Sequence, residues 1–424
     1  MNTLRSIKGL RWWMMSLLMV GAIINYLTRS TLSFAAPTFM KELDISTVEY
    51  SLILNAFQAT IMLQPLCGFV MDTLGLKLAM IIFATSWSVV TMGHALAGNW
   101  IAFAGLRGLL GLAEGSANPA GMKATAEWFP AKERGFAGGL YNIGASVGSM
   151  VAPVLVGYAI AHYNWRMAFV FTGAIGLVWV LVWRKFYHPR SSHPALSAEE
   201  AQYIEAGQET HLAGEAKKPS VRSLIHVRNF WGIALPRFLA DPTWSTLTFW
   251  LPLYLSEVRH FNLKEIALTA WLPFLAADLG CLFGGVIVAF LQRRGVGLID
   301  ARRGAFSVGA VMMLGMAFVG YVDSPYAAVA LLCLGGFAHQ TLSVTVITMS
   351  SDLFKRHEVA TVAGMAGTFG NAGILVFNLL IGVLLGKIGY TPFFIGLAAL
   401  DLLGAVVLWT VVRDPRTVAA PRAA

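Results

Sequence analysis

Long hydrophobic runs follow one another along almost the whole chain, separated by short polar stretches. Most runs hold about 18 or more residues, and a helix of that length, rising 1.5 Å per residue, crosses about 30 Å of hydrocarbon. The pattern therefore predicts an all-α membrane protein with twelve transmembrane helices. We place these helices at residues 12–36, 51–70, 78–97, 101–122, 136–159, 167–186, 231–255, 266–291, 306–321, 327–349, 359–385 and 393–412.

One polar interval is much longer than the others and divides the predicted helices into two groups of six. We expect an amino-terminal six-helix bundle at residues 1–186, a cytoplasmic connecting loop at 187–228 and a carboxyl-terminal six-helix bundle at 229–424. The loop carries Ser197 three residues before Glu200, the spacing of a helix capping box. This spacing predicts a short amphipathic helix whose charged residues are solvated.

The two bundles share a faint internal repeat. Four residues of the first half recur in the second at a constant offset of 225 residues, namely Phe129, Glu133, Gly139 and Gly148, followed by Phe354, Glu358, Gly364 and Gly373. Both sets occupy the loop after the fourth helix of their half and the helix that follows, as pseudo-symmetric halves of a transporter would require. The glycines of the fifth helix also predict a surface that another helix backbone can approach closely.

The composition and the distribution of charge fit this prediction. The chain is 57% hydrophobic and 12% charged, against roughly 25% charged residues in soluble domains. A net charge of +9 could indicate nucleic acid, but 22 of the 31 Lys and Arg residues lie in the two termini and the even-numbered loops. Positive residues gather on the cytoplasmic side of membrane proteins. We therefore expect both termini to be cytoplasmic, and no nucleic-acid partner.

Several classes of site are excluded by the sequence. The three cysteines lie in apolar segments without paired spacing, which argues against disulfides and a metal site. Asn25 and Arg29 interrupt the first apolar run, so this run does not have the pattern of a cleaved signal peptide. We find no nucleophile with a base at useful spacing and no phosphate-binding loop, so we expect neither an enzyme nor a cofactor.

Ionisable residues inside the predicted helices are the informative ones, because each costs at least about 2.5–3.5 kcal/mol in hydrocarbon. Arg107 and Glu114 on the fourth helix are seven residues apart. They share nearly one face but lie about 10.5 Å apart along the axis, so they cannot pair directly. Glu114 is therefore available to bind a proton. The alternative is a permanent structural ion pair.

Arg29 has no acidic residue close to it on the first helix. A guanidinium presents a planar fork of donors that suits a carboxylate, so a substrate anion is its natural counterion. The alternative is pairing with Glu114 or with an acid from another helix.

The second half carries a charge pair of a different kind. Arg237 and Asp241 are spaced i, i+4 on the seventh helix, where they can neutralise each other. Asp278 and Asp401 are further acids in predicted helices; Asp278 could complete a network with Arg237, and the sequence does not settle the role of either acid.

Polar residues of three helices could form a site for sugar hydroxyl groups. His339, Gln340 and Ser343 lie on the tenth helix, Asn142 on the fifth and Trp244 on the seventh, where its ring could cover an apolar sugar face. For His339 the alternative is a structural histidine with satisfied hydrogen bonds.

The sequence also resembles a known family, the major facilitator superfamily, and within it the anion:cation symporter group. The loop at 68–77, with Thr73 where an Arg is common, resembles the superfamily's motif between helices 2 and 3. The resemblance implies that Asp72 closes the inner gate by meeting a helix terminus or an Arg, and we group Arg237 and Asp241 with it as gating residues. More specific stretches are IKGLRWWM at Ile7, YLTRST at Tyr26, EWFPAKER at Glu127, FWGIALPRFLADPTW at Phe230, FNLKEIA at Phe261 and GGFAHQTLS at Gly335.

Those stretches are similar to bacterial hexuronate transporters, which take up glucuronate and galacturonate with protons. By this resemblance Tyr26 and Arg29 bind the substrate carboxylate, Arg107 is the fourth-helix arginine and Glu114 is the proton-coupling acid. Many related carriers have an Asp where this chain has Thr28, so a second protonation site is missing.

We therefore expect a monomeric, multi-pass protein of the bacterial inner membrane. Its partners are a hexuronate anion, protons and the lipid bilayer, and it imports the hexuronate by alternating access. The alternatives are a carrier for another sugar acid, such as an aldonate or glucarate, an exporter of amphiphiles, and a membrane sensor that binds a uronate without moving it.

Overall fold

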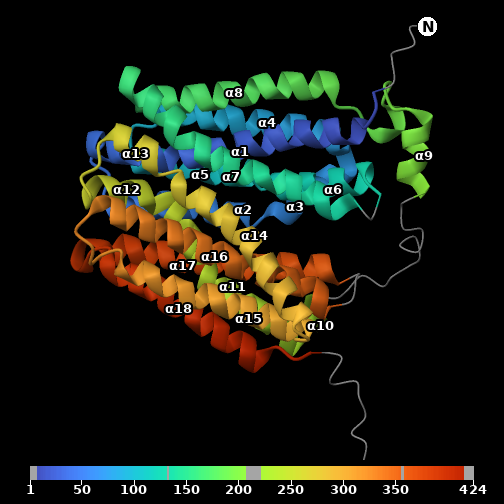
Figure 1. The fold of residues 1–424 in the computed structure, drawn as a ribbon. Helices are drawn as coiled ribbons and strands as arrows, with labels where there is room; N and C mark the ends of the chain where they lie inside the picture. The colour runs from blue at the N-terminus through green and yellow to red at the C-terminus, as the bar shows by residue number, and fades with distance from the viewer. Residues whose placement is uncertain (1–6, 131–132, 207–220, 355–357, 415–424) are drawn as a thin grey trace, which may run out of the picture. The chain divides into compact units, whose positions relative to one another are not determined.

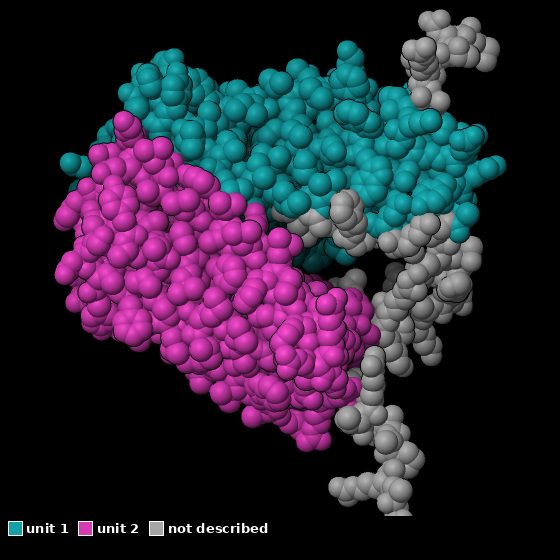
Figure 2. All heavy atoms as spheres, in the orientation of Figure 1, with its two compact units in different colours: residues 1–215 teal, residues 216–424 magenta. Residues whose placement is uncertain are grey.

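The computed structural model describes residues 7–130, 133–206, 221–354 and 358–414, and these residues form helices joined by short turns, with no strand among them (Figure 1). The all-α fold class predicted from the hydrophobic pattern is confirmed. The chain divides into two compact units, Met1–Glu215 and Ala216–Ala424, coloured separately in Figure 2. We describe each unit by itself.

Unit 1 contains the first six predicted membrane helices, and two of the six are broken into shorter pieces. Its elements are α1 (Leu10–Glu42), α2 (Thr47–Ile61), α3 (Gln64–Leu74), α4 (Leu76–Gly93), η1 (His94–Leu96), α5 (Trp100–Glu114), α6 (Ala117–Trp128), α7 (Arg134–His162), α8 (Trp165–Phe186), η3 (Arg190–Ser192) and α9 (Ala198–Ala206).

Unit 2 contains the last six predicted membrane helices. Its elements are α10 (Val221–Leu224), α11 (Arg228–Ser245), η5 (Thr246–Trp250), α12 (Leu251–Glu257), α13 (Leu263–Thr269), α14 (Leu272–Arg293), α15 (Leu298–Met312), η6 (Met313–Phe318), α16 (Pro325–Leu353), α17 (Val359–Ile388) and α18 (Thr391–Val411).

Each of the twelve predicted segments lies on one helix or on consecutive helices. Among the described residues, eight helices are long and apolar enough to cross a membrane, or nine when α2 and α3, bent by 42° at their junction, count as one. The other three predicted spans are interrupted, the fourth between α5 and α6, the seventh by the π-helical turn η5 and the ninth by the 3-10 turn η6. The sequence did not predict these interruptions.

Polar caps explain where several helices begin. Ser46 and Glu49 form a reciprocal capping box at the start of α2, and Asn262 and Glu265 form another at the start of α13. Each box satisfies backbone N–H groups that would otherwise lack a partner where a helix enters the hydrocarbon.

The internal repeat corresponds to repeated structure. Phe129 and Phe354 are the extended residues that end α6 and α16, and Glu133 and Glu358 are the residues that precede α7 and α17. Residues at the same offset therefore have the same role at helix ends in both units.

Two glycines of the repeat allow the same close contact in each unit. A Cβ atom at Gly148 of α7 would overlap the carbonyl oxygen of Ile23 on α1, and one at Gly373 of α17 would overlap that of Phe238 on α11. An ideal Cβ at Gly144 would likewise lie only 2.9 Å from the carbonyl oxygen of Met19. The predicted close approach of helix backbones is confirmed at these positions.

The segment between the predicted bundles is tied to the start of α1. The carboxylate of Glu200 on α9 accepts from the backbone N–H of Leu10 at 3.0 Å and from Nη1 of Arg11 at 2.7 Å. The Arg11 Nε also donates to Glu133 at 2.9 Å, and the Tyr203 hydroxyl donates to the same carboxylate at 2.6 Å.

The predicted cap of α9 is present, since the Glu200 N–H donates to the Ser197 hydroxyl at 3.1 Å. The prediction of a fully solvated charged face is wrong for Glu200, which is 7% exposed. The physical reason is that Gly9, the residue before α1, has no side chain to cap the helix, and Glu200 supplies the missing acceptor.

We expect Gly148→Ala to lower the free energy of unfolding by about 1–3 kcal/mol, because the added methyl group forces α7 away from α1. The matched control is Gly138→Ala on the same helix, where a Cβ meets nothing within 4 Å. The control should keep or slightly raise stability, by up to about 1 kcal/mol. Thermal unfolding of both purified variants in detergent measures the difference, and equal melting temperatures would contradict the packing argument.

Candidate functional site

A buried ion pair joins two helices inside unit 1. Nε of Arg29 on α1 lies 3.1 Å from Oε2 of Glu114, the last residue of α5. The Glu114 side chain is 0% exposed and the Arg29 side chain 15% exposed. Of the alternatives that the sequence left open, this structure therefore shows Arg29 paired with Glu114.

A break in the fourth span places Glu114 beside α1. Helix α5 ends at Glu114, and α6 begins at Ala117 after Gly115 and Ser116. The Ser116 hydroxyl donates to the carbonyl oxygen of Ala113 at 2.7 Å and so satisfies one of the carbonyl groups at the carboxyl-terminal end of α5. Just before the break, Gly111 lies directly against the backbone of Phe57 on α2, where a Cβ would not fit.

Residues of α1 complete the surroundings of the pair. The Thr28 hydroxyl lies 2.9 Å from Oε1 of Glu114, and Nη2 of Arg29 donates to Oδ1 of Asn25 at 3.3 Å. The guanidinium carbon of Arg29 lies 4.5 Å from the centre of the Tyr26 ring. Tyr26 and Arg29, which the resemblance implied for carboxylate binding, are therefore in contact.

Arg107 is a second guanidinium in the same region and is completely buried. Its Nη1 and Nη2 atoms donate to the backbone oxygen of Arg29 at 3.3 and 3.4 Å, and its Nε has no partner among the described residues. The Phe57 ring lies 4.6 Å from the guanidinium carbon of Arg107 and 5.2 Å from that of Arg29. Sequence analysis missed Phe57, which has the pattern of an ordinary apolar residue.

The charges of this cluster do not balance. Arg29 and Arg107 face one carboxylate, Glu114, and as the sequence spacing indicated, Arg107 makes no direct ion pair with it. When both guanidinium groups are charged, the described part of the cluster carries at least one excess positive charge. A buried positive charge favours the binding of an anion.

Asp72, the predicted gating acid of α3, meets a lysine. Nζ of Lys123 on α6 lies 2.7 Å from Oδ1 of Asp72, whose side chain is 75% exposed. Its partner is thus neither an Arg nor the helix terminus that the resemblance implied.

The expected pairing of Arg237 and Asp241 is present on α11, with Nη2 and Oδ2 2.9 Å apart. A Cβ at Gly370 of α17 would overlap the Asp241 carboxylate, so this glycine makes room for the pair. The Nε of Arg237 is buried and has no partner among the described residues.

The polar residues predicted to bind hydroxyl groups lie in unit 2, with one exception. The ring of His339 stacks on that of Trp244, with centres 6.2 Å apart and an interplanar angle of 22°. His339 and Ser343 are buried and Gln340 is half-buried. The exception is Asn142, whose side chain lies outside the described residues.

The His339 Nδ1 has no hydrogen-bond partner among the described residues. The alternative of a histidine with fully satisfied hydrogen bonds is therefore not what the structure shows.

The repeat relates the two groups of residues. The fourth span runs from Trp100 to Trp128 with its break, and α16 runs from Pro325 to Leu353. Both ends of the two segments differ by 225 positions, so His339 occupies the position of Glu114. Ile23 of α1 and Phe238 of α11 are equivalent, because each provides the carbonyl oxygen that faces a repeated glycine. These two residues are 215 positions apart, and the same offset relates Arg29 to Trp244. The ion pair of unit 1 and the aromatic stack of unit 2 thus occupy equivalent positions.

Asp401 on α18 is completely buried, and neither carboxylate oxygen has a hydrogen-bond partner among the described residues. It remains without an assigned role. Among the residues described, no group of three His, Cys, Asp or Glu could hold a metal ion.

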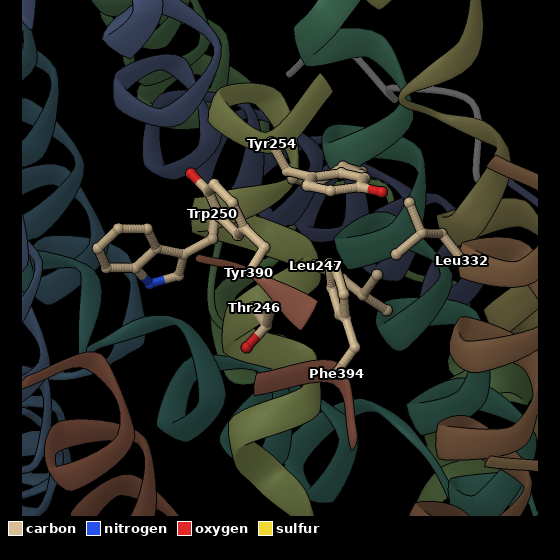
Figure 3. A pocket seen from close by; sticks show the side chains of 8 residues that line it. Thr246, Leu247, Trp250, Tyr254, Leu332, Tyr390 and Phe394 are labelled. Atoms are coloured by element: carbon tan, nitrogen blue, oxygen red, sulfur yellow. The ribbon is translucent and has the colours of Figure 1, made fainter. Parts of the chain in front are cut away.

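Unit 2 also contains an apolar cavity of about 10 Å³ beside the π-helical turn η5, large enough for about one water molecule. Figure 3 shows the aromatic and aliphatic side chains around it, including Trp250, Tyr254 and Phe394. No charged residue lines this cavity, so it does not suit a carboxylate. The turn is held by Asn378, whose Oδ1 accepts from Ser245 and from Trp250, each at 3.0 Å. Sequence analysis missed Asn378, an isolated polar residue.

Comparison with known proteins identifies relatives over almost the whole chain. Residues 18–299 and 296–424 match the sequence profile of the Major Facilitator Superfamily. The chain is 49% identical to the hexuronate transporter of Escherichia coli K12 over 415 residues, 97% of this chain and 96% of that protein. It is 48% identical to the galacturonate transporter of Dickeya chrysanthemi over 328 residues, 76% of this chain and 95% of that protein. These relatives are transporters, not enzymes.

A solved structure has the same fold. The crystal structure of a bacterial homologue of the human lysosomal transporter Spinster, in an inward-facing and unoccupied conformation, matches with a TM-score of 0.73. The match covers 96% of both chains at 16% sequence identity.

We expect Glu114→Leu to lower the free energy of unfolding by about 3–5 kcal/mol, because it leaves two buried guanidinium groups without a carboxylate. The double variant Arg29→Met, Glu114→Leu should lose less of the free energy of unfolding, because it removes one positive and one negative charge. Thermal unfolding in detergent measures both.

Arg166→Ala is the control for this prediction, because it breaks an exposed pair with Glu42 and should cost about 0–1 kcal/mol. A double variant as unstable as Glu114→Leu would show that the buried charges are not the cause.

Proposed function

Because this chain belongs to the Major Facilitator Superfamily, we propose that it imports a hexuronate with protons across the bacterial inner membrane by alternating access. The substrates are glucuronate and galacturonate, in line with the hexuronate and galacturonate transporters to which it is 49% and 48% identical. The observation that carries the proposal is the buried cluster of Arg29, Arg107 and Glu114, which holds two guanidinium groups and one carboxylate.

Proton binding and substrate binding are linked through Arg29. In the structure the Arg29 Nε donates to Glu114, so a substrate carboxylate must compete with Glu114 for this guanidinium. When Glu114 binds a proton it loses its charge, and the ion pair with Arg29 becomes a weaker hydrogen bond from the guanidinium to a neutral carboxyl group. Arg29 is then available to the substrate carboxylate, and Arg107 adds a second positive charge that favours the anion.

The hydroxyl groups of the sugar are assigned to the predicted polar residues Trp244, His339, Gln340 and Ser343, together with Asn142. Support comes from the unpartnered Nδ1 of the buried His339 and from the Trp244 ring on which it stacks. An aromatic face matches the apolar C–H face of a pyranose, and an unpartnered ring nitrogen can bind a hydroxyl group.

The remaining assignments complete the cycle. Asp72 with Lys123, and Arg237 with Asp241, are ion pairs that we assign to gating, since each pair can break and re-form when the carrier changes conformation. The distribution of Lys and Arg supports cytoplasmic termini. The protein works as a monomer.

We expect Arg29→Ala to abolish uptake of labelled glucuronate by proteoliposomes, because the carboxylate loses its counterion. Glu114→Gln should abolish accumulation driven by a pH gradient while keeping exchange of internal for external substrate, since a glutamine cannot release a proton. The control is Arg166→Ala, which removes an exposed guanidinium and should transport like the wild type. Gradient-driven accumulation by Glu114→Gln would overturn the assigned role, and competition by a panel of sugar acids identifies the preferred substrate.

We also expect one proton to accompany each monoanion, so that transport is electroneutral. A membrane potential is worth about 2.3 kcal/mol per charge per 100 mV, and it should therefore change uptake little, whereas an inwardly directed proton gradient should drive it. The measurement is glucuronate uptake with a potassium–valinomycin potential and with a pH gradient, each applied alone. A substrate-dependent current would contradict this stoichiometry.

A further inference from the structure

One hydroxyl group in unit 1 lies within hydrogen-bond distance of three oxygen atoms. The Thr28 Oγ1 lies 2.9 Å from Oε1 of Glu114, 2.8 Å from the carbonyl oxygen of Asn25 and 3.1 Å from that of Ile24. Thr28 is 1% exposed, so water cannot readily replace any of these bonds. A hydroxyl group has one hydrogen to donate and two lone pairs that accept. It can therefore donate fully to one of these oxygens at a time.

The direction of the bond between Thr28 and Glu114 depends on the charge of the carboxyl group. An ionised carboxylate only accepts, so the Thr28 hydroxyl donates to Oε1 while the Arg29 Nε donates to Oε2. A carboxyl group protonated on Oε1 becomes a donor and needs an acceptor. The Thr28 Oγ1 is that acceptor once its own hydrogen turns to the carbonyl oxygen of Asn25.

We propose that Thr28 is a positioning residue of the proton-binding site, whose hydroxyl reverses its hydrogen bond so that Glu114 is bonded in both protonation states. This inference rests on the proposed role of Glu114. A proton from water binds Oε1, the new O–H donates to Thr28, and the Thr28 hydrogen rotates to the Asn25 carbonyl. No hydrogen leaves Thr28, and the reverse rotation accompanies loss of the proton.

The surroundings of Glu114 make this role specific to Thr28. The charged groups that face the carboxyl group are Arg29 from α1 and Arg107 from α5. An arginine carries only donors, so neither can accept a hydrogen bond from a protonated Glu114. On the α2 side the neighbour of both arginines is the ring of Phe57, and on α7 the Tyr141 hydroxyl already donates to Ala117 at 2.7 Å. Thr28 lies within hydrogen-bond distance of Oε1, and its hydroxyl can act both as a donor and as an acceptor.

The first test compares two modes of transport in proteoliposomes containing the full chain. Thr28→Val keeps the shape of the side chain and removes the hydroxyl, and Thr28→Ser keeps the hydroxyl and is the matched control. We expect Thr28→Val to slow glucuronate uptake driven by a pH gradient about tenfold, which is the rate change that corresponds to the loss of one hydrogen bond to a charged group. Exchange without a gradient should stay within about twofold of the wild type, and Thr28→Ser should behave like the wild type in both assays.

The same substitution in the Glu114→Gln background separates this role from a structural one. With no proton to bind, Thr28→Val should leave the exchange rate of Glu114→Gln unchanged. Equal losses of uptake and exchange, or a loss of exchange when Thr28→Val is added to Glu114→Gln, would show that Thr28 serves only the structure and would overturn the proposal. Wild-type uptake by Thr28→Val would overturn it as well.

A second test does not depend on the substrate. Infrared difference spectra between acidic and neutral pH should show the carbonyl stretch of protonated Glu114, which disappears in Glu114→Gln. In Thr28→Val this band should move to higher wavenumber, because the carboxyl group loses a hydrogen bond, whereas Thr28→Ser should keep it in place. An unshifted band in Thr28→Val would overturn the inference. Failure of the wild type to transport any uronate would instead refute the proposed function and leave this spectroscopic test valid.

Discussion

The structure of unit 1 depends on one constraint, the cost of keeping charge out of water. Arg29, Arg107 and Glu114 come from two helices and are largely shielded from solvent, where an unpaired ion is expensive. The helices that hold these residues are also packed closely against other helices, since Gly111 lets α5 lie against α2 and Gly148 lets α7 lie against α1. Unit 1 therefore combines small residues at its helix contacts with charged residues inside its spans.

The two units solve the same packing problem with different chemistry. In unit 1 the positions equivalent by repeat carry the Arg29–Glu114 ion pair, and in unit 2 they carry the stacked rings of Trp244 and His339. The repeat preserved the backbone contacts, as Gly148 and Gly373 show, while the side chains diverged.

Sequence reasoning predicted the helices well because an apolar run of about 18 residues or more is rarely found outside a membrane span. It could not predict the break after Glu114 or the π-helical turn after Ser245, since both depend on contacts with other helices and leave no mark on hydropathy. It left the partner of Arg29 open, because residues 85 positions apart have no fixed distance in a chain without a known packing. It treated Glu200 as solvated, because the need of α1 for an external cap is invisible before the fold is known. The equivalence of Trp244 with Arg29 also went unnoticed, because its offset of 215 differs from the offset of 225 found in the sequence.

The cap that Glu200 provides has a mechanical consequence for α1. The same helix is bonded to α9 through Leu10 and Arg11 near its first turn and to α5 through Arg29 farther along. A slip of α1 along its axis by one turn, about 5.4 Å, would break both sets of bonds at once. Glu200 and Glu114 together therefore fix the axial register of α1, and rotation or tilting of α1 together with its bonded neighbours disturbs these contacts less than sliding does.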